Sequence, residues 1–124
     1  MIKDQKLFDL SFLEEMDGNN FIAEVLTLFI RETEEDLAEM KLACDRGAFD
    51  TVCNLAHKLK GSTGMIQANT LWMFLQQIED LASSDKKAEV ADHVLKASLE
   101  FDRLKAALQQ FLKELQDWPG AKQQ

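Results

Sequence analysis

The sequence has few of the residues that interrupt helices or build sheets. Proline occurs once and glycine five times in 124 residues, and tyrosine is absent. Strand-rich folds need frequent turn residues and favour aromatic and β-branched side chains. Their scarcity argues against a β fold, whereas long uninterrupted helices are easily formed. We therefore expect an all-α protein.

Positive charge and long apolar runs are also missing. The formal net charge is -8, and no basic stripe runs through the sequence. Nucleic acids and anionic membrane surfaces both require clustered Lys and Arg, so we expect neither as a partner. No stretch approaches the length of a membrane span, and the N-terminal MIKDQKLFDL lacks the apolar core of a secretory signal. These absences indicate a cytoplasmic protein.

Cysteine is scarce as well, with only Cys44 and Cys53 present. Both fall inside helical patterns, which favours small buried side chains in a reducing compartment over a disulfide or a metal pair. We expect no metal site elsewhere in the chain either. Bundle di-metal sites need a Glu-x-x-His pair on each of two helices, and the surroundings of His93 do not provide that spacing.

Residues that interrupt helices divide the sequence into one short and four long helical stretches. We expect helices over about 8–16, 19–46, 49–65, 69–82 and 86–118. Apolar residues recur at spacings of three and four in the long stretches, and the last one carries a heptad pattern made by Val90, Val94, Ala97, Phe101, Leu104, Leu108, Phe111 and Leu115.

Each apolar stripe needs neighbouring helices to cover it, and short connections favour antiparallel neighbours. The sequence therefore predicts an antiparallel four-helix bundle with a short extra N-terminal helix that caps one end. The bundle domain would span residues 1–118 and be followed by a polar tail over 119–124. We expect a monomer.

One polar face of the third stretch combines a histidine, a lysine and two glycines. At about 100° per residue, with Val52 at zero, His57 falls at roughly 140°, Lys60 at 80°, Gly61 at 180° and Gly64 at 120°. His57 therefore points away from the core, and the other three share its side of the helix.

The glycines of this face work against helix stability, since each costs about 1 kcal/mol relative to alanine in a helix interior. They clear bulky side chains from the surface beside His57, so that a partner could approach the imidazole. Lys60 lies one turn from His57, where an ammonium could neutralise an added phosphoryl group. A plainer reading remains open, in which His57 is an ordinary solvated residue and Gly61 and Gly64 mark the end of the helix.

The run AHKLKGSTG, residues 56–64, resembles the signature of histidine-containing phosphotransfer (HPt) domains of multistep phosphorelays. The resemblance extends over nearly the whole chain and implies a four-helix bundle with an exposed phosphoacceptor. It implies that His57 accepts the phosphoryl group, that Lys60 helps to neutralise it, and that Glu79 hydrogen-bonds the imidazole Nδ1. One departure is Gln67-Ala68-Asn69, where many members have a glycine before a small residue.

A docking face for the partner follows from the same resemblance and from the helical angles. The residues expected on it are Gly61, Gly64, Ser62, Lys58, Leu13 and Met16.

The implied reaction is reversible transfer between His57 and aspartyl phosphates of response-regulator receiver domains, with a (hybrid) sensor histidine kinase upstream. No Gly-rich nucleotide loop is present, so we expect a carrier without kinase activity of its own. We expect no bound cofactor, with Mg²⁺ brought by the receiver. The alternative is a non-catalytic adaptor or structural bundle, which the heptad pattern would serve equally well.

Overall fold

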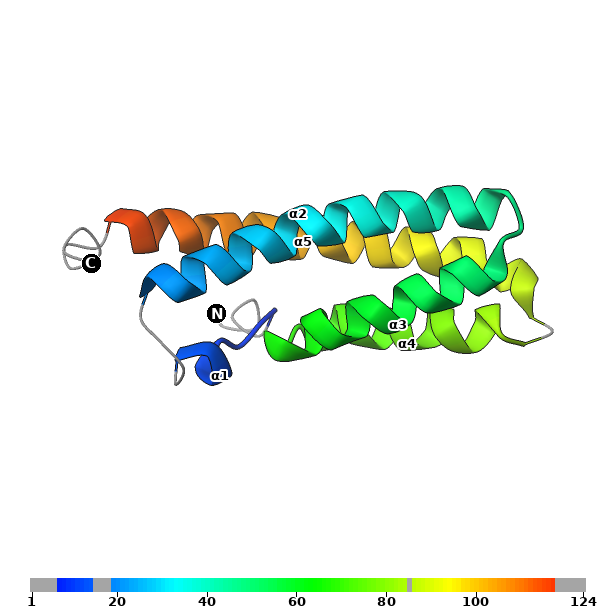
Figure 1. Ribbon diagram of the computed structural model, residues 1–124, viewed down its shortest axis with the longest axis horizontal. Coiled ribbons are helices and arrows are strands. Elements are labelled where there is room, and N and C mark those ends of the chain that lie inside the picture. The colour runs from blue at the N-terminus through cyan, green and yellow to red at the C-terminus, as the bar shows by residue number, and fades with distance from the viewer. Residues whose placement is uncertain (1–6, 15–18, 85, 118–124) are drawn as a thin grey trace.

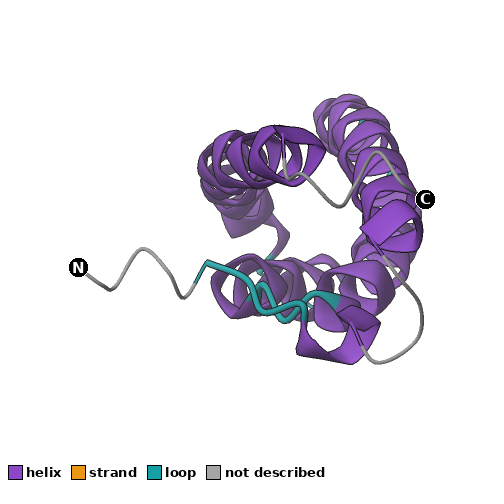
Figure 2. Cartoon of the chain, turned by 90° about the vertical axis from the view of Figure 1, so that its left-hand side faces the viewer, coloured by secondary structure: helices purple, strands orange, loops and turns teal. Residues whose placement is uncertain are grey.

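The computed structural model describes residues 7–14, 19–84 and 86–117, and its elements in chain order are α1 (Ser11–Glu14), α2 (Asn19–Asp45), α3 (Phe49–Met65), α4 (Asn69–Ala82), the 3-10 turn η2 (Lys87–Glu89) and α5 (Val90–Asp117). Each long helix runs opposite to the one before it (Figure 1), and from one end the four surround a common interior (Figure 2). Helix α5 closes the bundle by packing on both α4 and α2. The predicted all-α four-helix bundle is confirmed.

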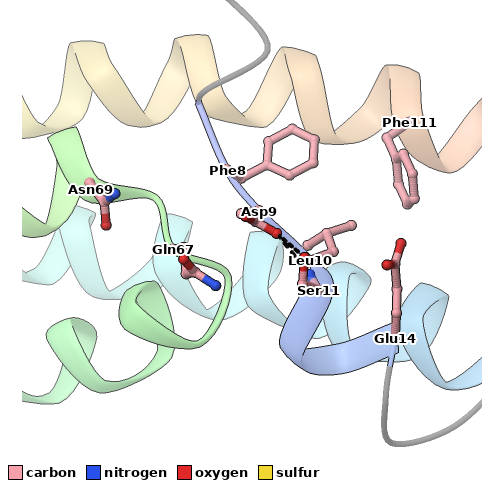
Figure 3. Close-up of a pocket in the computed structure, with 8 residues that line it drawn as sticks. All are labelled: Phe8, Asp9, Leu10, Ser11, Glu14, Gln67, Asn69 and Phe111. Atoms are coloured by element: carbon pink, nitrogen blue, oxygen red, sulfur yellow. Dashed lines mark hydrogen bonds between the residues drawn. The ribbon is translucent and has the colours of Figure 1, made fainter.

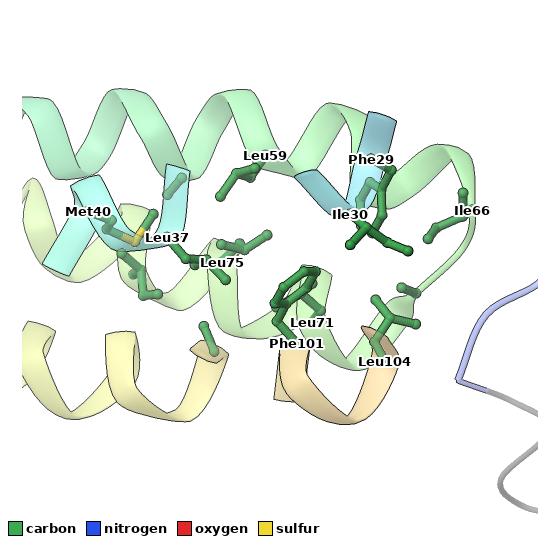
Figure 4. Packing of buried hydrophobic residues seen from close by; sticks show 14 of the residues in the cluster. Phe29, Ile30, Leu37, Met40, Leu59, Ile66, Leu71, Leu75, Phe101 and Leu104 are labelled. Carbon is green, nitrogen blue, oxygen red and sulfur yellow. The ribbon is translucent and has the colours of Figure 1, made fainter. Parts of the chain in front are cut away.

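The core of the bundle follows the apolar stripes closely (Figure 4). The apolar residues at helical spacing in α4 are buried, namely Leu71, Leu75, Ile78 and Ala82. The first six residues of the heptad pattern in α5 are buried as well. Phe29 of α2 and Phe101 of α5 meet edge to face across the interior, with ring centroids 6.4 Å apart.

The stripe of α2 is wider than the sequence spacing predicted. The spacing by threes and fours predicts a stripe of Ile22, Val25, Phe29, Leu37, Met40 and Cys44. In the structure Leu26 and Ile30 are buried as well, whereas Val25 and Cys44 are only partly buried. A stripe spaced by threes and fours is narrow, but α2 is covered from two sides, by α3 and by α5. Its buried face therefore takes in an extra row of side chains.

Helices α2 and α3 end in the same way. The amide of Ala48 donates to Ala43 and that of Gly47 to Cys44, which is the pattern of a Schellman cap around Gly47 at a φ of 74°. The sequence predicts a helix that ends at about residue 46, before Gly47, and α2 ends at Asp45.

At the end of α3, the amide of Ala68 donates to Thr63 and that of Gln67 to Gly64. Gln67 thus takes the left-handed position of the cap, at a φ of 51°. The sequence of this turn departs from the HPt pattern because it lacks a glycine. Gln67 nevertheless takes the backbone conformation that is typical of glycine.

The short first helix covers less of the chain than predicted. Residues 7–10 are not helical, and α1 begins only at Ser11. Asp9 explains the late start, because its amide donates to the Ile66 carbonyl at 2.7 Å while its carboxylate accepts from the Ser11 amide at 2.9 Å. The segment before α1 is thereby tied to the turn between α3 and α4. Residues 15 and 16 lie outside the described part of the chain.

The last helix also starts later than predicted. A 3-10 turn over Lys87–Glu89 precedes α5, and the Ser84 hydroxyl accepts a hydrogen bond from the Lys86 amide at 3.0 Å. The tail predicted over 119–124 lies outside the described residues. None of the described helices is long and apolar enough to cross a membrane.

Candidate phosphotransfer site

The antiparallel pair α3 and α4 brings two neighbouring residues of α3 together with one that is distant in the sequence. His57 and Lys60 lie one turn apart on α3, and Glu79 faces them from α4. The His57 side chain is 75% exposed, so the imidazole stands out from the bundle as its helical angle predicted. The Glu79 and Lys60 side chains are 22% and 15% exposed, and they form the partly enclosed floor beside it.

Glu79 uses both carboxylate oxygens in this cluster. Oε2 lies 3.1 Å from His57 Nδ1, and Oε1 lies 2.7 Å from Lys60 Nζ. The Lys60 ammonium holds the pKa of Glu79 below its ordinary value of 4.5; partial burial opposes this effect, and His57 reinforces it. An ionised carboxylate only accepts hydrogen bonds, so His57 must carry its proton on Nδ1. In the neutral ring Nε2 is then unprotonated and available as a nucleophile.

Lys60 has two further neighbours that were not singled out from the sequence as parts of the site. Gln76 Oε1 accepts a hydrogen bond from Lys60 Nζ at 2.5 Å, and the Trp72 ring lies with its centroid 5.2 Å from the same ammonium. Gln76 is itself held by its Nε2, which donates to Asp80 at 3.0 Å. Helical spacing could have placed Trp72, Gln76 and Glu79 on one side of α4, but not opposite Lys60.

The two glycines of α3 leave open surface beside the imidazole. A Cβ atom at Gly61 would meet nothing within 4 Å, and one at Gly64 would meet only the Trp72 indole, at 3.9 Å. Gly61, Gly64 and Met65 border a surface hollow of about 420 Å³. Neither glycine is required by packing inside the bundle.

Two residues predicted on the docking face make contacts of their own. Lys58 is 61% exposed but pairs with Asp36 of α2 at 3.0 Å, and that hydrogen bond together with the charge of Asp36 raises the Lys58 pKa above its ordinary value. Ser62 is half-buried, and its hydroxyl donates to the Leu59 carbonyl at 3.2 Å. Lys58 therefore borders the side of His57 that faces α2, away from Glu79.

The docking role expected for Leu13 is wrong. Leu13 has no exposed surface and belongs to the core cluster, because α1 folds its apolar side against the end of the bundle. Met16, the other docking residue predicted on the first helix, lies outside the described residues.

Of the other features weighed in the sequence, Cys53 borders this cluster, because its thiol donates to the Glu79 carbonyl at 3.8 Å. His93 Nδ1 lies 3.0 Å from the Glu89 carbonyl of its own helix turn. Cys44 and Cys53 are free and partly buried, and burial raises the pKa of both thiols. Among the residues described, no three His, Cys, Asp or Glu side chains are grouped so as to hold a metal ion.

A larger hollow of about 570 Å³ lies at one end of the bundle (Figure 3). It is bordered by the segment that leads into α1, by the turn at Gln67 and by Phe111 of α5. It shares no lining residue with the His57 cluster, but Gln67 borders both this hollow and the smaller one at Gly61 and Gly64.

Comparison with known proteins supplies the family. The family model of the Hpt domain matches residues 24–118, which include His57, Lys60 and Glu79. Searches of curated proteins and of solved structures returned no match. Hpt domains carry phosphoryl groups rather than acting as autonomous kinases, and they interact with receiver domains and kinases. The chain belongs to the Hpt domain family, whose function is histidine phosphotransfer in phosphorelay signalling.

Proposed function

We propose that His57 accepts a phosphoryl group from the aspartyl phosphate of one receiver domain and passes it to another. The arrangement of His57 and Glu79 carries this proposal. A carboxylate at 3.1 Å fixes the proton on Nδ1 and leaves Nε2 as the nucleophilic nitrogen of a ring that is 75% exposed.

The transfer needs no proton to leave Nε2. Its lone pair forms the new N–P bond as the P–O bond of the aspartyl phosphate breaks, and the receiver carboxylate leaves with the electron pair. The ring gains positive charge, which the Glu79 carboxylate stabilises through Nδ1–H. The reverse sequence returns the phosphoryl group to a receiver aspartate.

Charge neutralisation is shared between the two proteins in this proposal. Lys60 supplies one positive charge close to the imidazole, which balances part of the charge of a dianionic phosphoryl group. We place the remaining positive charge, a Mg²⁺ ion, in the receiver. The upstream donor is then a receiver that is itself supplied by a (hybrid) sensor histidine kinase, with all partners in the cytoplasm.

The test is to mix the protein with a receiver domain phosphorylated on its aspartate. We expect phosphate on this chain that is stable to base and labile to acid, as N-linked phosphate is. His57→Gln should abolish the label, and His93→Gln, the matched control at the other histidine, should keep it. Label that survives His57→Gln, or no transfer from any receiver of the source organism, would overturn the assignment.

A further inference from the structure

Beside Lys60, helix α4 carries a large aromatic side chain that the core does not need. Trp72 is 38% exposed and lies outside the buried stripe of α4, which consists of Leu71, Leu75, Ile78 and Ala82. Its indole faces α3, where Gly64 leaves the space that it borders. The position of this ring therefore calls for an explanation other than core packing.

The Lys60 ammonium is enclosed on three sides. Gln76 Oε1 lies at 2.5 Å, Glu79 Oε1 at 2.7 Å and the centroid of the Trp72 ring at 5.2 Å from Nζ. The result is a lysine side chain only 15% exposed, next to a histidine that is 75% exposed. Lysine is a flexible residue whose charge is usually mobile, and here the charge is fixed in place before any partner arrives.

The third neighbour of the ammonium, the Trp72 ring, affects the net charge around Lys60. Glu79 already balances the positive charge of Lys60, and a second carboxylate in place of Trp72 would leave a net negative charge beside His57. The face of an indole attracts an ammonium through its quadrupole and adds no net charge. Trp72 can therefore hold Lys60 without adding negative charge that would repel a phosphoryl group.

We propose that Trp72 is a positioning residue for the phosphotransfer, which holds the Lys60 ammonium beside His57 by a cation–π contact. This inference rests on the proposed function of His57 and adds to it. Trp72 acts through Lys60, so its contribution does not depend on contact with the receiver.

The experiment replaces the receiver by phosphoramidate, a phosphoryl donor too small to dock on the face. The P–N bond of the donor breaks and ammonia leaves, while the phosphoryl group bonds to Nε2 of His57. The proton on Nδ1 stays there, hydrogen-bonded to the Glu79 carboxylate. The variants are Trp72→Leu, which keeps an apolar side chain without a ring, and Trp72→Phe, which keeps an aromatic face. Met73→Ala, at an exposed neighbouring residue, is the matched control. Circular dichroism verifies that each variant is folded.

We expect Trp72→Leu to slow phosphorylation of His57 by about fivefold, which corresponds to the loss of one cation–π contact. Trp72→Phe should recover most of the rate, and Met73→Ala should leave it unchanged. In a Lys60→Ala background, Trp72→Leu should cause no further slowing. A Trp72→Leu rate equal to wild type, equal slowing by Leu and Phe, or the same slowing with Lys60 absent would each overturn the inference.

The two proposals fail in different ways. If the receiver assay gives no label on His57 while the phosphoramidate series shows the expected pattern, the relay function is wrong and the positioning of Lys60 stands. If receivers label His57 normally and the phosphoramidate series shows no dependence on Trp72 through Lys60, the relay stands and the role of Trp72 is wrong.

Discussion

Glu79 Oε2 lies 3.1 Å from His57 Nδ1, although 22 residues separate the two along the chain. The contact joins α3 to α4, so the protonation of the exposed imidazole is set from the neighbouring helix. The same carboxylate pairs with Lys60 through its other oxygen. A single residue of α4 therefore orients both the nucleophile and the cation of the proposed reaction.

Changes at Glu79 should alter the reactivity of His57 according to whether they leave a hydrogen-bond acceptor for Nδ1–H. Glu79→Ala removes the acceptor, and we expect transfer from a phosphorylated receiver to slow by about tenfold or more, as with loss of other partners that orient a histidine. Glu79→Gln keeps an amide oxygen that can accept from Nδ1–H, so its loss of rate should be smaller. Stopped-flow transfer assays measure the rates, and ¹⁵N NMR of the imidazole reports the tautomer.

Gln77→Ala, at an exposed position of the same helix, is the control and should transfer at the wild-type rate. Equal rates for wild type and Glu79→Ala, or an unchanged proton on Nδ1 in that variant, would contradict the orienting role.

Most of the fold could be predicted because its signals are local. Gly47 ends α2 through its own left-handed φ, and the apolar residues of α4 and α5 lie at helical spacing, whatever the rest of the chain does. The predictions failed where distant contacts decide. The amide of Asp9 is held by Ile66, which shortens α1, and Leu26 is buried because two helices cover α2. Neither contact leaves a local trace in the sequence.

The residues of the site also divide into those that one helix predicts and those that depend on distant contacts. The outward direction of His57, and the presence of Lys60 and the glycines on its face, follow from the geometry of one helix. The position of Gln76 and Trp72 around Lys60 depends on the register between α3 and α4, which helical periodicity does not determine. Glu79 was identified only through resemblance to the family, which supplied the register that periodicity lacks.

Stability should depend on pH through Glu79. Its pKa in the folded protein is lowered from 4.5, chiefly by Lys60. The ionised form is therefore favoured by folding, and its contribution to stability is complete above about pH 4.5 and is lost as the pH falls through the folded pKa. We expect the difference in unfolding free energy between wild type and Glu79→Gln to shrink on acidification below that pH. Urea unfolding between pH 3 and 7 measures it, and a difference independent of pH would contradict the ion pair.

Gln67 holds a backbone conformation that glycine adopts without strain. Gln67→Gly should raise the unfolding free energy by about 1 kcal/mol, because a left-handed residue with a side chain costs about that much more. Gly47→Ala is the converse change at the equivalent cap of α2 and should lower the unfolding free energy by a similar amount. Chemical denaturation measures both, and a destabilising Gln67→Gly would show that the Gln67 side chain contributes more than its backbone costs.

Leu13 should matter for stability and not for transfer. The side chain is fully buried in the core cluster, so Leu13→Ala should lower the unfolding free energy by about 2–4 kcal/mol. At a temperature where both proteins are folded, the rate of transfer from a receiver should be unchanged. A loss of transfer without a loss of stability would restore Leu13 to the docking face.

The open surface at Gly64 should limit the size of the residue tolerated there. A Cβ atom at this position meets only the Trp72 indole, at the ordinary contact distance of 3.9 Å, so Gly64→Ala should fold, gain up to about 1 kcal/mol in helix stability and still transfer. Gly64→Gln should fold as well, but its longer side chain projects over the face on which a receiver must dock. We therefore expect Gly64→Gln to block transfer from the receiver and to leave labelling of His57 by phosphoramidate near the wild-type rate. Normal transfer from the receiver to Gly64→Gln would show that this surface does not need to be clear, and slow labelling by both donors would place the defect at His57 itself.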